Sequence, residues 1–135
     1  MDEVIFLDAN IFLEVALGDA KQEACKALLA ELVAGRRKGY TSDFIMYSCL
    51  LQIQHKTNDR DKMEKFTLFL NSIPALQIIR CSLSEIRTAI VSMQKHRLDF
   101  DDALVVSCMA HKGISALCSL DRDFDRVSTI RRLEP

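Results

Sequence analysis

The sequence predicts an α/β fold, a three-layer α/β/α sandwich in which helices cover both faces of a central parallel sheet. Three observations predict it. Short apolar runs alternate with amphipathic helical patterns through the whole chain. The first run, residues 4–7, is apolar throughout, which is typical of a strand buried on both faces. Acids directly follow two of the runs, where parallel sheets bind ligands. With 135 residues and no linker or repeat, residues 1–135 are expected to form a single domain.

The predicted strands are short apolar runs bounded by polar or turn-forming residues. Residues 4–7 end abruptly at Asp8, and Pro74 separates the preceding helical region from the third run. In chain order, the strands are predicted at residues 4–7, 40–41, 76–80, 115–119 and 127–133.

The predicted helices are recognised by apolar residues at helical spacing and by their caps. Ser42 is in the position of an N-cap, residues 82–85 form a capping box, and Gly39 and Gly113 are predicted to end the helices before them. In chain order, the helices are predicted at residues 10–17, 21–38, 43–56, 61–70, 82–95 and 101–111. An apolar stripe on the fourth helix is expected to lie in the core; it comprises Met63, Phe66, Phe69 and Leu70.

Composition narrows the class of protein. The formal net charge is −1, so no global positive field attracts nucleic acid, and RNA contacts must come from local patches or a bound metal. The five cysteines include no Cys-x-x-Cys pair, which favours buried thiols over a disulfide framework or a zinc knuckle. The three histidines also lack metal-ligand spacing. The chain lacks a signal-peptide pattern and an apolar stretch of membrane-spanning length, so we expect a cytoplasmic protein without a membrane partner.

Acidic residues gather at positions that the predicted fold brings to one crevice. Asp8 ends the first strand, Asp101 and Asp102 open an apolar helix, and Asp121 follows the fourth strand. Asp101 and Asp102 can also stabilise a helix N-terminus, and Asp121 and Asp123 can be turn residues. Crowded carboxylates need a compensating cation, and Mg²⁺ or Mn²⁺ prefers oxygen ligands. As a set, these acids predict a metal site.

Three segments carry a resemblance to a known family. They are Ile5-Phe6-Leu7-Asp8-Ala9-Asn10, Leu98-Asp99-Phe100-Asp101-Asp102-Ala103-Leu104 and Ser119-Leu120-Asp121-Arg122-Asp123-Phe124. In order and spacing the chain resembles the PIN domain family, which includes the VapC-type toxins of VapBC toxin–antitoxin pairs. The resemblance implies a PIN-like fold and a ribonuclease using Mg²⁺ or Mn²⁺ that leaves a 5′-phosphate and a 3′-hydroxyl. It also implies roles for individual residues: Asp8, Asp102 and Asp121 as catalytic metal ligands, and Asn10, Ser119, Asp123 and Asp101 as accessory residues.

One position departs from the family pattern. The family places a Glu about two turns into the helix after the second strand, and the corresponding position here falls at or near Ser48. Serine supplies no negative charge. Glu14 and Asp43 are local substitutes, although we favour an exposed helix acid for Glu14 and a first-turn acid for Asp43.

The acidic crevice therefore predicts metal-assisted hydrolysis of an RNA phosphodiester, and the resemblance implies that the protein is the toxin of a toxin–antitoxin pair. The resemblance also implies an antitoxin protein as partner and a homodimer. The Ser48 departure keeps open a catalytically impaired PIN-fold module for binding or regulation. A phosphoryl-transfer enzyme with Asp8 as nucleophile fits less well, because the expected second acid two residues later is Asn10. A receiver domain, which needs paired acids near the first strand, also fits poorly.

Overall fold

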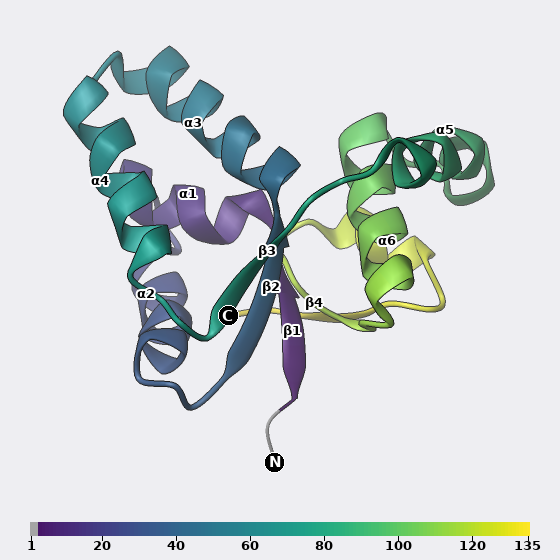
Figure 1. The fold of residues 1–135 in the computed structure, drawn as a ribbon, viewed down its shortest axis with the longest axis horizontal. Helices are drawn as coiled ribbons and strands as arrows, with labels where there is room; N and C mark the ends of the chain where they lie inside the picture. The colour runs from purple at the N-terminus through teal and green to yellow at the C-terminus, as the bar shows by residue number, and fades with distance from the viewer. Residues whose placement is uncertain (1–2) are drawn as a thin grey trace.

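The computed structural model describes residues 3–135, which form one five-stranded sheet covered by helices (Figure 1). All strand pairs are parallel, and the strand order is β3-β2-β1-β4-β5. The strands are β1 (Val4–Leu7), β2 (Lys38–Ser42), β3 (Leu76–Ile79), β4 (Ala116–Cys118) and β5 (Arg131–Leu133).

Helices cover both faces of this sheet. Those from the first half of the chain, α1 to α4, lie on one side, and α5 and α6 lie on the other (Figure 1). This arrangement confirms the predicted α/β/α sandwich. The helices are α1 (Ala9–Leu17), α2 (Gln22–Val33), α3 (Asp43–Thr57), α4 (Arg60–Asn71), α5 (Leu83–His96) and α6 (Phe100–Lys112), with a 3-10 helix η1 (Arg122–Arg126) before β5.

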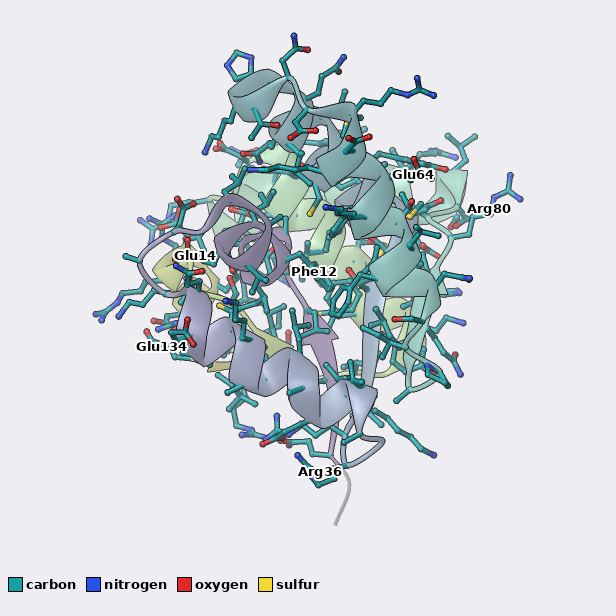
Figure 2. All side chains as sticks on the ribbon, turned by 90° about the vertical axis from the view of Figure 1, so that its left-hand side faces the viewer. Phe12, Glu14, Arg36, Glu64, Arg80 and Glu134 are labelled. Atoms are coloured by element: carbon teal, nitrogen blue, oxygen red, sulfur yellow. The ribbon has the colours of Figure 1, made fainter. Side chains whose placement is uncertain are left out.

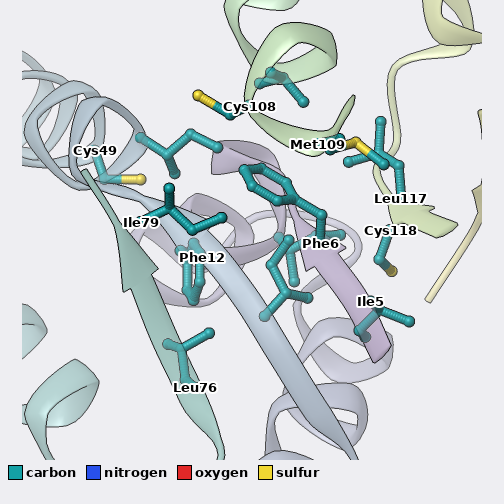
Figure 3. Close-up of a cluster of buried hydrophobic side chains, with 14 of the residues drawn as sticks. Ile5, Phe6, Phe12, Cys49, Leu76, Ile79, Cys108, Met109, Leu117 and Cys118 are labelled. Atoms are coloured by element: carbon teal, nitrogen blue, oxygen red, sulfur yellow. The ribbon is translucent and has the colours of Figure 1, made fainter. Parts of the chain in front are cut away.

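The core is built around β1, the middle strand. Ile5, Phe6 and Leu7 are all completely buried, as the continuous apolar run predicts. Figure 3 shows Phe6 beside Met109 of α6 and Leu117 of β4. Because β1 is held on both edges and both faces, the residue that follows it is rigidly placed.

Local signals set most element boundaries as predicted. The Ser42 hydroxyl caps α3 by accepting a hydrogen bond from the Ile45 amide at 3.1 Å. Ser82 and Glu85 form the predicted reciprocal capping box at the start of α5. Gly113 ends α6 in the left-handed conformation, with φ of 68°.

The predicted helix at residues 21–38 is too long. It ends at Val33, and Gly35, with φ of 75°, turns the chain towards β2. Gly39 does not end a helix but lies inside β2, where it is buried. A Cβ atom at this position would lie 2.8 Å from Leu32 Cδ2, so the close approach of α2 to the sheet favours glycine there.

The predicted last strand, residues 127–133, is shortened at its N-terminal end. Only Arg131–Leu133 pairs with β4. The Val127 amide instead bonds to the Phe124 carbonyl, and the Ile130 amide bonds to the Val127 carbonyl. These turns keep Val127 buried beneath η1 rather than extended along the sheet edge.

The predicted apolar stripe on α4 lies against the core. Phe66 and Leu70 are buried, and Met63 and Phe69 are partly buried against the same cluster. Within residues 3–135, none of the helices has the length and apolarity to cross a bilayer.

Candidate active site

Asp8 lies at the centre of the acidic site, at the junction of β1 and α1. Its carboxylate caps α1 by accepting a hydrogen bond from the Ala9 amide at 2.8 Å. Only 7% of the residue is exposed. Its backbone amide donates to the Cys118 carbonyl at 3.1 Å, which joins the end of β1 to the end of β4.

A hydrogen-bond network fixes the Asp8 carboxylate. The buried Ser119 hydroxyl donates to Asp8 Oδ2 at 2.6 Å, and Asn10 Nδ2 donates to the same oxygen at 3.2 Å. Asn10 Nδ2 lies 3.2 Å from Ser119 Oγ as well, while Asn10 Oδ1 accepts from the Leu120 amide at 3.2 Å. Asn10 and Ser119 therefore hold Asp8 in one orientation from two sides.

Asp101 and Asp102 occupy the first turn of α6. Asp102 is partly buried, whereas Asp101 is exposed and accepts a hydrogen bond from the Asp102 amide at 3.0 Å. The N-cap residue, Asp99, makes no side-chain capping hydrogen bond, and Asp101 and Asp102 are the acids of the first turn.

Asp121 and Asp123 lie beyond β4, where the chain enters η1. Asp121 accepts a hydrogen bond from the Asp123 amide at 2.9 Å, and its own amide donates to Ser119 Oγ at 3.0 Å. Carboxylate oxygens of Asp102, Asp121 and Asp123 all lie within 4.8 Å of one another. Asp123 also forms an ion pair with Arg126 at 3.3 Å, which partly neutralises its negative charge.

The acids surround one cavity of about 300 Å³ at the carboxyl ends of β1 and β4. The fold thus brings residues from the beginning, the third quarter and the end of the chain to one place. The cavity is lined by Asp8, Asn10, Glu14, Asp19, Ser48, Gln52, Lys56, Asp101, Asp102 and Asp121, together with Ala9, Leu13 and Leu17. Ser119 lies beneath it and Asp123 beside it, each through the contacts described above.

Crowding and burial disfavour the charged forms of two acids. Burial raises the pKa of Asp8, and the charges of Asp121 and Asp101 raise it further, while the Ser119 hydrogen bond opposes the rise. Burial and the neighbouring carboxylates raise the pKa of Asp102 to about 8. A bound cation would remove this penalty, so the oxygen-rich cavity fits Mg²⁺ or Mn²⁺.

The α3 wall of the cavity carries no acid. Ser48, Gln52 and Lys56 face it from successive turns. Gln52 and Lys56 were missed by the sequence prediction, although their four-residue spacing from Ser48 places them on one helical face. Asp19, after α1, was missed too, and nothing in its local sequence indicated the cavity.

The two possible substitutes for the missing Glu lie in different places. Glu14 lines the cavity and accepts a hydrogen bond from the Lys21 amide at 3.0 Å. Figure 2 shows it on a different side of α1 from Phe12, which packs edge-to-face on Phe66 of α4. Asp43 is outside the cavity lining, and its carboxylate accepts from the Phe44 and Cys81 amides at 2.8 and 3.0 Å. Asp43 is a structural residue of the α3 N-terminus.

Comparisons with known proteins identify the family. The PIN domain family model matches residues 5–130. A solved structure of VapC20 from Mycobacterium tuberculosis, described as a toxin that cleaves the sarcin-ricin loop, matches with a TM-score of 0.80 and 19% identity. That match covers 97% of this chain and 99% of the VapC20 chain.

Chains from two toxin–antitoxin complexes have the same fold as this chain. A chain of VapBC2 from Rickettsia felis, solved with a promoter DNA fragment, matches with a TM-score of 0.73 and 17% identity over 97% of this chain and 98% of that one. A chain of a toxin–antitoxin complex from Klebsiella pneumoniae matches with a TM-score of 0.69 and 16% identity over 94% and 95%. The comparison with curated protein sequences gave no match. The family model, the shared fold and the ordered acidic segments lead to one conclusion: this chain belongs to the PIN domain family.

Proposed function

We propose that this chain, folded as one PIN-like domain over residues 1–135, is a metal-dependent ribonuclease and the toxin of a toxin–antitoxin pair. The observation that carries the proposal is the cavity in which Asp8, Asp101, Asp102 and Asp121 meet. Raised pKa values of Asp8 and Asp102 support it. They show that burial and mutual repulsion disfavour the charged carboxylates, and a bound cation would offset this repulsion. Membership of the PIN family and the likeness to VapC20 support the substrate class.

Asp8, Asp102 and Asp121 are the proposed catalytic ligands of Mg²⁺ or Mn²⁺, with Asp101 and Asp123 as accessory acids. When bound, the metal would acidify a water and offset negative charge on the scissile phosphate. Ser119 and Asn10 hold the Asp8 carboxylate in place and are positioning residues. Lys56, on the α3 wall of the cavity, is suited to contact an RNA phosphate.

An RNA cleavage assay tests the proposal. With Mg²⁺ or Mn²⁺ the wild-type protein should cleave RNA, and Asp8→Asn should reduce the rate by more than about 100-fold, because it removes a central charge from the metal site. Asp61→Asn is the matched control, since Asp61 is an exposed acid on α4. Equal cleavage by wild type and Asp8→Asn would contradict the proposed mechanism.

The uncharged α3 wall favours a second candidate function, a catalytically impaired PIN module for binding or regulation. Ser48 lines the cavity where the family pattern expects a Glu. Calorimetric titration with Mn²⁺ discriminates the two functions, because a binding-only module should show little uptake at the acidic cavity.

Restoring the acid extends this test. Under the nuclease proposal, Ser48→Glu should tighten Mg²⁺ binding by about tenfold or more, since ligand charge sets affinity for hard cations. Gln52→Glu, one turn away on the same wall, is the control for added charge alone. If both variants bind Mg²⁺ like the wild type and neither cleaves RNA, the binding module is the better description.

The proposed protein partner is an antitoxin. Similar structures include chains of VapBC and FitAB toxin–antitoxin complexes, which supports a partner of this class. An apolar groove of about 210 Å³ between α1, α2 and α4 is flanked by Lys62 and Lys65, and would suit an apolar segment with acidic flanks. Co-expression with the product of a neighbouring short reading frame should yield a complex in which RNA cleavage is suppressed.

The chain is also proposed to form a homodimer. The outer face of α5 exposes Leu83, Ile90 and Val91 at 72%, 56% and 80%. A cluster of exposed apolar side chains on one helix face is typical of an interaction surface. The molar mass in solution, measured by light scattering, distinguishes monomer from dimer.

A further inference from the structure

A second group of metal-ligating side chains lies on the α5–α6 side of the sheet, away from the acidic cavity. Cys81 follows β3, Glu85 is in the first turn of α5, and Cys108 is on α6. The two sulfur atoms are 3.1 Å apart, and Cys108 Sγ is 3.6 Å from Glu85 Oε2. One ligand atom from each of the three residues lies within 4.8 Å of the others. None of these residues lines the acidic cavity.

The Glu85 carboxylate lacks a strong partner. The residue is only 6% exposed, and its carboxylate oxygens lie 3.3 Å from the Ser82 amide, 3.5 Å from His111 Nε2 and 3.6 Å from Cys108 Sγ. No lysine or arginine within residues 3–135 pairs with this carboxylate. A buried charge normally requires full pairing or a metal ion.

The two thiols supply the charge that a divalent cation requires. A thiol that binds a metal loses its proton and becomes a thiolate ligand.

One of the two distances already matches a tetrahedral site, and the other is shorter. With Zn–S bonds of about 2.3 Å and Zn–O bonds of about 2.0 Å, tetrahedral geometry places two sulfurs about 3.8 Å apart and a sulfur and an oxygen about 3.5 Å apart. The Cys108–Glu85 separation of 3.6 Å is already close to this value. The sulfurs, at 3.1 Å, would have to separate by about 0.7 Å. A disulfide would require them to approach by about 1 Å.

The Glu85 end of the cluster borders a surface cavity. A cavity of about 250 Å³ is lined by Glu85 and His111, and also by Arg80 and Lys112. His111 is largely exposed, with Nε2 at 3.5 Å from Glu85 Oε1, and a rotation of this side chain towards the sulfurs would make it the fourth ligand. Two thiolates and a carboxylate around a divalent cation leave one net negative charge, which Arg80 and Lys112 would offset.

We propose that Cys81, Glu85 and Cys108, with His111 as the fourth ligand, form a binding site for Zn²⁺ or a similar thiolate-preferring divalent cation. The site is structural, because four protein ligands would leave no position for substrate. It joins the segment after β3 to the C-terminal half of α6. This site is independent of the proposed nuclease activity.

Cobalt titration tests the site. The full chain is reduced with a phosphine, freed of metal and titrated with Co²⁺, which reports thiolate coordination through sulfur-to-metal charge-transfer absorption. We expect this absorption to saturate at one equivalent and to disappear when Zn²⁺ is added. The acidic cavity offers oxygen ligands and cannot produce such a band, so the result does not depend on nuclease function.

Variants assign the ligands. Cys108→Ser should weaken Zn²⁺ binding by more than about 100-fold. Loss of a residue that only hydrogen-bonds to a ligand costs about 10–100-fold in affinity, and loss of the ligand itself should cost more. His111→Ala removes another direct ligand and should also weaken Zn²⁺ binding by more than about 100-fold. Cys25→Ser is the matched control, since Cys25 is a buried thiol on α2. Circular dichroism checks folding, and the half-buried Cys81→Ser replaces Cys108→Ser if that variant does not fold.

Two results would overturn the proposal. One is an absence of charge-transfer absorption in the reduced wild-type protein. This result overturns the proposal also when mass spectrometry finds that Cys81 and Cys108 form a disulfide in air before reduction. The other is full absorption in both the Cys81→Ser and Cys108→Ser variants. Loss of absorption in these variants and its retention in Cys25→Ser would establish the site.

Discussion

The Ser119 hydroxyl joins the two ends of the chain at the acidic cavity. It is fully buried, donates to Asp8 Oδ2 at 2.6 Å and accepts from the Asp121 amide at 3.0 Å. The first of these bonds lowers the pKa of Asp8 against the effect of burial. A single hydroxyl therefore helps to keep the central carboxylate charged and correctly directed.

Replacement of this residue should impair the site without removing an acid. We expect Ser119→Ala to reduce Mg²⁺-dependent RNA cleavage by about 10–100-fold and to weaken Mg²⁺ binding, because Asp8 loses its shortest hydrogen bond. Cleavage rates and calorimetric titration measure the two effects. Ser115→Ala, at the exposed opposite end of β4, should behave like the wild type. Unchanged rates in Ser119→Ala would show that Asp8 needs no support from this hydroxyl.

The acids should also make the metal-free protein sensitive to pH. The pKa of Asp102 is about 8 in the folded state but about 3.9 in an unfolded chain. Between these values the folded state binds more protons, so the free energy of unfolding should fall as the pH rises through this window.

Thermal unfolding in EDTA between pH 4 and about 8 tests this dependence on Asp102. Asp102→Asn should give a flatter profile and a higher melting temperature near pH 8, because it removes the buried charge. Added Mg²⁺ should raise the wild-type melting temperature more at pH 8 than near pH 5, since ligation displaces protons. If the melting temperature of the wild type depended on pH as little as that of Asp102→Asn, Asp102 would not be the source of the pH dependence.

At the scale of elements, caps and hydrophobic periodicity were sufficient to predict a helix boundary where local interactions determine that boundary. Ser42 and the Ser82–Glu85 box begin their helices as predicted because each cap involves neighbours within three residues. Gly39 was misassigned because its role depends on contact with a different element. Its neighbour Leu32 is adjacent only after α2 has packed on the sheet.

This contact gives a prediction for the α2–β2 interface. Gly39→Ala should destabilise the protein by about 1–3 kcal/mol, because the new methyl group would overlap the buried Leu32 side chain. Urea unfolding measures the change. In a Leu32→Ala background the additional cost of Gly39→Ala should be much smaller, since the opposing methyl groups are absent. If the destabilisations by Gly39→Ala and Leu32→Ala simply add in the double variant, the cost of Gly39→Ala does not arise from overlap with Leu32.

At the scale of the whole molecule, sequence patterns predicted a parallel sheet, whereas its strand order came from the structure. The acidic residues were predictable because strand ends mark the ligand-binding edge of any parallel sheet. The position of Lys56 on the cavity wall depends on how α3 crosses that edge, which local patterns do not encode. The Cys81–Cys108 pair was not predictable either, because its residues are 27 positions apart and meet only through the packing of α5 on α6.

The exposed face of α5 leads to a prediction for assembly. If the proposed homodimer uses this face, Val91→Glu should shift the protein from dimer to monomer, because a charge would be buried in an apolar contact. Light scattering measures the molar mass. Leu68→Glu, at a 60% exposed apolar position on α4, is the matched control and should leave the dimer intact. Retention of the dimer in Val91→Glu would exclude this face as the interface.

The place of β1 between β2 and β4 has a consequence for biosynthesis. Asp8 is translated before Asp102 and Asp121, which follow it by 94 and 113 residues. Until β4 emerges from the ribosome, one edge of β1 has no neighbour and the acidic cavity does not exist. A nascent chain therefore carries no assembled site until β4 and the residues after it have been made and have packed beside β1.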